Sequence, residues 1–221
     1  MSYRSYWKLA FMTKPIKKAA TPLAPRKSPT QARSVATVEA ILQAAAHILE
    51  TEGLSACSTN AVARKAGVSI GSLYQYFPSK DAISRALILE QTTALVEDAE
   101  KIDLQQGGRK ALEDLIDVAI IHQLKRPALA KILDAEELRL PVAADLKRQS
   151  ARLRKTVHDI LSQADMPEGA NDAEVMADLM GIIKGLVDAA GARAGSDSPA
   201  SATNLRKRVR RAVFGYLDAG E

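Results

Sequence analysis

The sequence of 221 residues predicts an all-α protein. Apolar side chains recur at helical spacing along most of the chain, and no segment alternates between apolar and polar residues for long enough to predict a strand. Serine, glycine and proline stand at the breaks between the periodic segments, where helices typically begin and end.

The composition excludes several classes of protein. Hydrophobic residues make up 47% of the chain, but no apolar run approaches the ~20 residues of a membrane span. The single cysteine, Cys57, excludes an internal disulfide and a cysteine-rich metal site. No apolar stretch near the start is long enough for a secretory signal. We therefore expect a cytoplasmic protein without a membrane partner, a metal or another cofactor.

The net charge of +5 is concentrated at the N-terminus. Residues 1–38 contain eight basic and no acidic residues, which leaves a net charge of −3 on residues 39–221. Four prolines interrupt this segment and no apolar period runs through it, which predicts a disordered basic arm at residues 1–29. Such an arm can hold nucleic acid through phosphate contacts, or it can be a solvated tail without a specific role.

The first predicted helix follows this arm and ends at Gly53. One of its faces is apolar and is formed by Val38, Ile41, Leu42, Ala45 and Leu49. Ser58 can cap a second, short helix with a buried side of Val62, Ala63 and Ala66. Gly67 then turns the chain.

Ser69 can cap a third helix, which ends near Phe77 because Pro78 cannot continue it. Ser79 can cap a fourth and longer helix, which we expect to reach about Asp103. Breaks rich in glycine or proline separate the remaining predicted helices, at residues 109–125, 128–138, 142–164, 172–193 and 204–218.

Two short helices joined by a glycine-containing turn predict a helix-turn-helix, whose second helix enters the major groove of DNA. The apolar positions that hold this pair against the first helix are Val62, Ala63, Ala66, Val68, Leu73 and Phe77. Tyr74 and Tyr76 are not among these packing positions, and the phenolic hydroxyl group of a tyrosine can reach a phosphate oxygen of DNA. Gly71 removes a side chain where DNA could come close, and Lys80 adds a positive charge to the backbone amides that begin the fourth helix.

The stretch STNAVARKAGVSIGSLYQYFPSKDAI, residues 58–83, resembles the DNA-binding region of the tetracycline-repressor (TetR) family of bacterial regulators. The resemblance extends back through RSVATVEAILQAAAHIL, residues 33–49. It rests on the spacing of Gly67, Val68, Leu73, Tyr74, Tyr76, Phe77 and Lys80. It implies a three-helix DNA-binding domain at residues 30–79 and a helical domain at residues 80–221 that binds a small ligand and forms a dimer.

The resemblance also implies roles for individual residues. It assigns contacts with DNA phosphates to Thr59, Tyr74, Tyr76 and Lys80. It assigns the reading of base edges to Asn60, Ile70, Gly71 and Ser72, with Gln75 beside them. Two positions depart from the family pattern. Ala61 stands where a glutamate often completes the capping box, so that Ser58 caps alone, and Asn60 stands where arginine is common, which favours adenine over guanine.

Any effector pocket must be aliphatic or polar, because no Phe, Tyr or Trp lies between Phe77 and Phe214. It cannot hold a flat cation between aromatic rings, which favours an aliphatic, partly polar or acidic effector. The candidate effector contacts are His122, Asp134 and Met176. The alternatives are a hydrogen-bonded core histidine for His122, which we favour, and a surface charge for Asp134.

The last two predicted helices carry more apolar surface than one core requires, which predicts a homodimer. Gly181, Gly185 and Ala189 are spaced four apart and would let a neighbouring helix approach closely. Two helices from each chain would make a four-helix bundle. The candidate interface residues are Leu179, Ile182, Gly185, Leu186, Val209, Val213 and Tyr216. Packing within the chain's own core is the alternative.

These observations predict a transcriptional regulator that binds a palindromic operator in double-stranded DNA. We expect a repressor of its own or neighbouring genes that a small-molecule effector releases. One alternative, an enzyme on a helical scaffold, is disfavoured because no metal-ligand spacing or nucleophile motif occurs and the three histidines are scattered. The other alternative is an architectural DNA binder without an effector.

Overall fold

The computed structural model describes residues 32–193 and 199–219, so the arm predicted at residues 1–29 lies outside the described residues. The described residues form helices and no strand, which confirms the all-α prediction. The elements are α2 (Ala32–Glu52), α3 (Thr59–Ala66), α4 (Ile70–Tyr76), α5 (Lys80–Ala99), the 3₁₀ turn η1 (Leu104–Gln106), α6 (Gly108–Lys125), α7 (Pro127–Arg139), α8 (Ala143–Leu161), α9 (Ala173–Arg193) and α10 (Pro199–Asp218).

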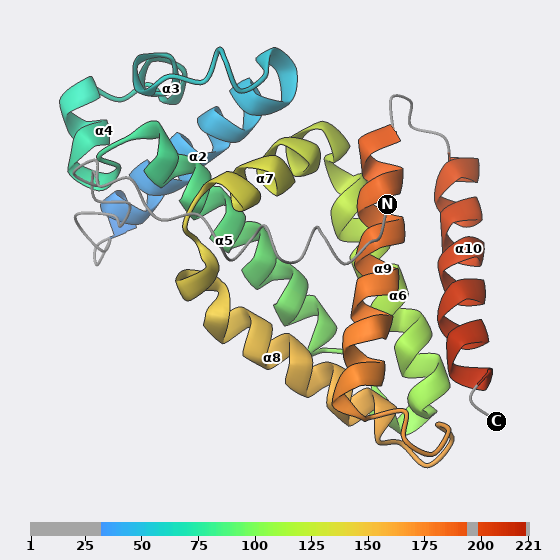
Figure 1. Ribbon diagram of the computed structural model, residues 1–221. Helices are drawn as coiled ribbons and strands as arrows, with labels where there is room; N and C mark the ends of the chain where they lie inside the picture. The colour runs from blue at the N-terminus through green and yellow to red at the C-terminus, as the bar shows by residue number, and fades with distance from the viewer. Residues whose placement is uncertain (1–31, 194–198, 220–221) are drawn as a thin grey trace, which may run out of the picture.

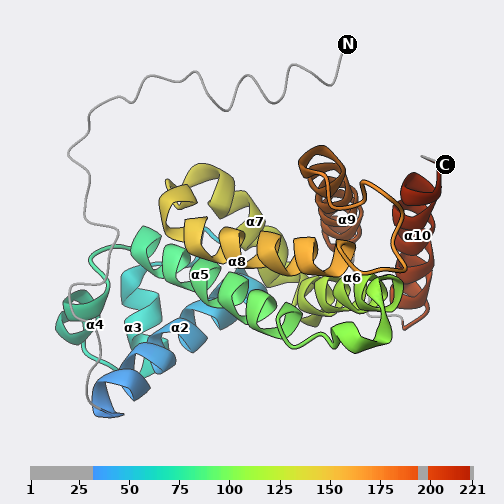
Figure 2. The same ribbon diagram turned by 90° about the horizontal axis from the view of Figure 1, so that it is seen from below.

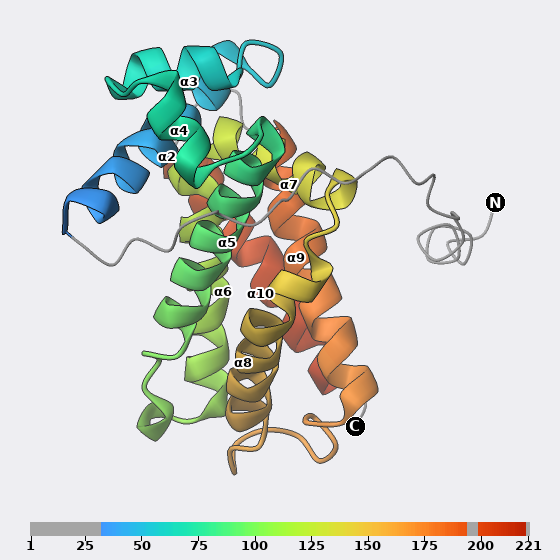
Figure 3. The same cartoon turned by 90° about the vertical axis from the view of Figure 1, so that its left-hand side faces the viewer.

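The helices α2, α3 and α4 form one end of the molecule, and α5 leads from them to the other helices (Figure 1). The helix α8 runs beside α5 in the same direction and is tied to it by the Arg85–Asp145 and Arg152–Glu100 ion pairs (Figure 2). At the far end, α9 and α10 lie side by side and both pack on α6. The helix α7 packs against both α2 and α9, and so connects the two ends (Figures 1 and 3).

The buried apolar residues form two clusters, and these do not divide at residue 80. The first cluster joins α2, α3, α4 and the first half of α5 with Leu129 and Leu133 of α7. The second cluster joins the ends of α5 and α8 with α6, α9 and α10. The helix α7 lies within the predicted domain 80–221, yet part of its apolar side packs with the predicted domain 30–79.

Two helix boundaries differ from the prediction by four or more residues. The helix α5 ends at Ala99 rather than near Asp103, because the Asp103 carboxylate accepts a hydrogen bond from the Gln105 N–H and starts η1 instead. The helix α10 begins at Pro199 rather than at residue 204, because a proline fits the first turn of a helix, where its missing N–H is not needed. In the described ranges, no helix combines the length and the apolar character that crossing a membrane would require.

Candidate DNA-binding site

Serine caps fix the helix-turn-helix locally, as the sequence predicts. The Ser58 hydroxyl oxygen accepts a hydrogen bond from the Ala61 N–H at 3.2 Å, without a glutamate to complete a capping box. Gly67 ends α3 in the left-handed conformation, with φ of +69°, which a residue with a Cβ adopts only at a cost. The Ser69 hydroxyl oxygen then accepts from the Ser72 N–H at 3.0 Å and starts α4.

A buried face holds α3 and α4 in place. Val62 and Leu73 are 0% exposed and Phe77 is 1% exposed, and all three belong to the cluster shared with α2. Because these side chains point inward, the opposite sides of α3 and α4 point to solvent. Most of the predicted recognition residues on these two helices occupy that outer side, whereas the half-buried Tyr76 packs against the buried cluster.

The predicted DNA contacts are exposed or half-buried at the end of the molecule formed by α3, α4 and the start of α5 (Figure 3). Asn60, Ile70, Gly71, Tyr74, Gln75 and Lys80 are exposed, whereas Thr59, Ser72 and Tyr76 are half-buried. Two large hydrophobic residues are among them: Ile70 is 38% exposed and Tyr74 is 42% exposed.

A hydrogen bond joins the two helices of the motif on this surface. The Thr59 Oγ1 lies 3.1 Å from the Tyr74 Oη, so the first residue of α3 fixes the phenol on α4. The sequence assigned both residues to phosphate contact but did not reveal this pairing, which joins positions 15 residues apart. The pair presents two hydroxyl groups at one point of the surface.

The start of α5 completes the site. The Ser79 hydroxyl oxygen accepts from the Ala82 N–H at 3.2 Å, and the exposed Lys80 is the first residue of the helix. The next residue, Asp81, forms an ion pair with Arg139 at the end of α7. Arg139 has no sequence signal that places it here, because only the folded chain brings it to the start of α5.

The candidate effector contacts do not come together. The His122 Nε2 lies 2.9 Å from the Asp98 Oδ2, so this half-buried histidine has its polar partner on α5. Met176 packs at the edge of the second apolar cluster. Asp134 lines a cavity of about 300 Å³ with Lys131, Asp188 and Ala189. Of the three candidates, Asp134 lines this cavity, whereas His122 and Met176 are not among its lining residues.

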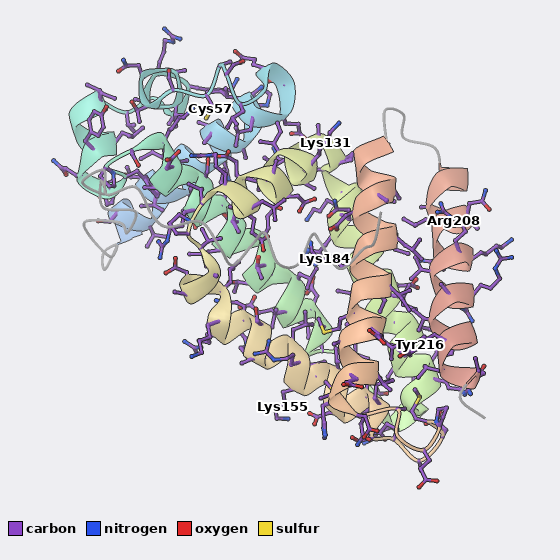
Figure 4. All side chains as sticks on the ribbon, viewed as in Figure 1. Cys57, Lys131, Lys155, Lys184, Arg208 and Tyr216 are labelled. Carbon is purple, nitrogen blue, oxygen red and sulfur yellow. The ribbon has the colours of Figure 1, made fainter. Side chains whose placement is uncertain are left out.

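Charged groups surround the cavity that Asp134 lines. Burial raises the pKa values of the Asp134 and Glu137 carboxyl groups, because it disfavours their charged forms. Lys184 extends from α9 towards the space between α9 and α5, and its ammonium group lies 2.8 Å from the Asp188 carboxylate (Figure 4). The cavity wall thus carries both signs of charge.

The structure corrects part of the predicted interface. Leu179, Val209 and Val213 are at most 1% exposed and lie in the chain's own second cluster, so their side chains cannot face a partner. Ile182 and Leu186 are half-buried at the edge of the same cluster. Gly185 is exposed, and Tyr216 is 38% exposed and lies between α10 and α9, where its hydroxyl donates to Asp178 at 2.6 Å (Figure 4).

An exposed polar and aromatic surface on a capped helix-turn-helix defines a DNA-binding protein of the helix-turn-helix class. Residues 41–87 match the family model described as bacterial regulatory proteins, tetR family. Over these residues the chain is similar to this family of bacterial regulatory proteins.

Two known proteins have sequences similar to parts of this chain. The nucleoid occlusion factor SlmA of Vibrio atlanticus is 28% identical over 156 residues, which cover 66% of this chain and 80% of that protein. The A-factor receptor protein of Streptomyces griseus is 37% identical over 83 residues, but the match spans only 36% of this chain and 30% of the receptor.

Solved structures share the fold. The fatty acid degradation regulator FadR from Bacillus halodurans has a TM-score of 0.66 at 18% identity, covering 86% of this chain and 97% of that one. A TetR-family transcriptional regulator from Streptomyces coelicolor has a TM-score of 0.56 at 23% identity, covering 82% of this chain and 99% of that one. At these identities, the similarity shows the helical architecture alone.

Proposed function

We propose that this protein is a cytoplasmic transcriptional repressor that binds a palindromic operator as a homodimer and is released by a small-molecule effector. No catalytic step is part of the proposal. The observation that carries it is the outer side of α3 and α4, where Ile70, Tyr74 and Gln75 are exposed and lie outside the apolar cluster that holds the two helices. In this proposal, Thr59, Tyr74, Tyr76 and Lys80 contact phosphates, and Asn60, Gln75 and residues 70–72 read base edges.

The experiment that tests the proposal selects DNA duplexes from a randomised pool with the purified full-length protein. We expect a palindrome with half-sites about 34–36 Å apart, one helical turn of DNA. Asn60→Ala or Gln75→Ala should relax the preference at particular base pairs, mirrored in both half-sites, by about 1–3 kcal/mol for each good contact. Binding without any sequence preference would contradict the proposal and favour an architectural DNA binder.

Gly71 offers a second test, because the chain itself does not require glycine there. A Cβ at this position would have the Ser69 hydroxyl at 3.9 Å as its nearest neighbour, and Gly71 is not among the glycines with positive φ. Gly71→Ala should therefore stabilise the fold by about 0.5–1 kcal/mol, since glycine is costly inside a helix. The same variant should bind the selected operator more weakly, because the methyl group keeps the DNA away. Unchanged operator affinity would remove Gly71 from the recognition surface.

The proposed dimer uses the outer face of α9 and α10. A Cβ added at Gly181, Gly185 or Gly215 would find no atom of the chain within 4 Å, so this face is open to close approach by a partner helix. Gly185→Leu should weaken the dimer by overpacking that approach, by about 1–3 kcal/mol. Sedimentation at several protein concentrations measures the effect. Wild-type protein that sediments as a monomer at micromolar concentration would exclude the dimer.

The cavity lined by Asp134 is the proposed effector site. We propose an aliphatic, partly polar or acidic effector, because the cavity is lined by Ala189 and by both a lysine, Lys131, and the carboxylates of Asp134 and Asp188. Its binding would tilt α5 and move the two recognition helices apart. A coupling of about 1–3 kcal/mol between the two sites is enough to vacate an operator. Binders from a metabolite screen that never alter operator affinity would contradict the release mechanism.

A further inference from the structure

Arg139, in the last turn of α7, bridges its own helix to the first turn of α5. Its Nε lies 2.8 Å from the Glu136 Oε1, and its Nη2 lies 2.7 Å from the Glu136 Oε2. The same guanidinium group donates to Asp81, with Nη2 at 2.6 Å from Oδ1 and Nη1 at 3.3 Å from Oδ2. Asp81 and Arg139 are 58 residues apart in the sequence, so the bridge exists only in the folded chain.

Glu136 fixes the orientation of the Arg139 guanidinium group. It is 1% exposed, and a buried carboxylate is costly unless a cation pairs with it and its oxygens are hydrogen-bonded. The Arg139 guanidinium holds the pKa of Glu136 below its ordinary value, and a hydrogen bond from Ser84 of α5 adds to this effect. Because the planar guanidinium is held by Glu136 on one side, its remaining N–H groups are oriented before they meet Asp81. Both Asp81 and Ser84 of α5 are thus tied to the end of α7.

The location of the bridge makes it relevant to DNA. Asp81 directly follows Lys80, and both belong to the helix start that the Ser79 cap presents at the DNA-binding end. A carboxylate beside a phosphate contact weakens DNA binding by repulsion. The presence of Asp81 at this position therefore needs another reason. We propose that Arg139 and Asp81 are positioning residues for DNA binding, which fix the first turn of α5 so that Lys80 reaches its phosphate. This inference rests on the phosphate contact proposed above for Lys80.

Asp81→Asn distinguishes a positioning role from a purely electrostatic effect, because the two predict opposite changes in DNA-binding affinity. Removing a negative charge beside DNA should strengthen binding if charge alone matters. We expect weaker binding instead, by about tenfold, as for the partial loss of a charge-assisted contact in each half-site. The probe is the duplex that wild-type protein selects from a randomised pool, titrated at several KCl concentrations. The slope of log K against log [KCl] should fall as it does in Lys80→Ala.

A double-mutant cycle tests whether the bridge acts through Lys80. In a Lys80→Ala background, neither Asp81→Asn nor Arg139→Gln should weaken binding further. Arg139→Gln leaves Glu136 buried without its cation and can fail to fold, whereas Asp81→Asn keeps the Glu136–Arg139 pair and carries the test alone. Arg126→Gln is the matched control, since Arg126, the residue directly before α7, pairs with Glu50 of α2 at 2.6 Å and so also links this part of the chain to the DNA-binding helices. It should leave the salt slope unchanged.

Four outcomes would overturn the inference. Tighter binding by Asp81→Asn, or rescue of Arg139→Gln by Asp81→Asn, would mean that Arg139 only screens a charge. A normal salt slope in Asp81→Asn, combined with a reduced slope in Lys80→Ala, would remove the positioning role and leave the phosphate contact intact. A normal slope in Lys80→Ala itself would remove the phosphate contact, and with it the positioning role.

Discussion

Phe77→Ala should lower the free energy of unfolding by about 3–5 kcal/mol. Phe77 is 1% exposed and lies directly after α4, in the apolar cluster that α2, α3, α4, α5 and α7 share. Removing the ring leaves a cavity that close-packed helices fill only in part, so both transfer energy and contacts are lost. The loss is a large share of the ~5–15 kcal/mol that stabilises a typical domain.

Urea unfolding followed by far-ultraviolet circular dichroism measures this effect, at one protein concentration because a dimer adds stability by mass action. Leu138→Ala is a suitable control. Leu138 is 92% exposed on α7, so its truncation should change stability by less than about 0.5 kcal/mol. Equal effects of the two substitutions would mean that Phe77 does not hold the helix-turn-helix to the rest of the fold.

Lys80→Ala should weaken binding to every DNA sequence alike, because phosphates carry no base identity. Each half-site should lose about 1.5–3 kcal/mol, the usual contribution of a hydrogen bond to a charged group. The slope of log K against log [KCl] should also fall by about one unit per half-site, since one fewer counterion is released from each. The measurement is a titration of operator variants with single base changes, repeated at several KCl concentrations.

Lys155→Ala is the matched control for this experiment. Lys155 is exposed on α8, away from α3 and α4, and pairs with Asp159 (Figure 4). Lys155→Ala removes the same charge from the protein as Lys80→Ala does. Comparing the two variants therefore separates the loss of a direct DNA contact from the effect of a lower net charge. Altered base preference in Lys80→Ala, with an unchanged salt slope, would show that Lys80 reads bases rather than phosphates.

The sequence determined the features that depend on neighbours within one helical turn. Ser58, Ser69 and Ser79 each cap the helix that follows, because a serine hydroxyl reaches the N–H three residues later wherever the helix lies in the fold. Gly67 ends α3 in the left-handed conformation for an equally local reason. The spacing of apolar residues around these signals was enough to predict a helix-turn-helix and its outward-facing residues.

Which helix faces pack together depends on the fold of the whole chain. An apolar side chain such as Val209 has the same helical spacing whether it packs inside the chain or against a partner, and the structure places it in the chain's own core. The pairing of Arg139 with Asp81 and of His122 with Asp98 joins residues from different helices. Such pairs depend on the path of the whole chain, and helical periodicity carries no information about that path.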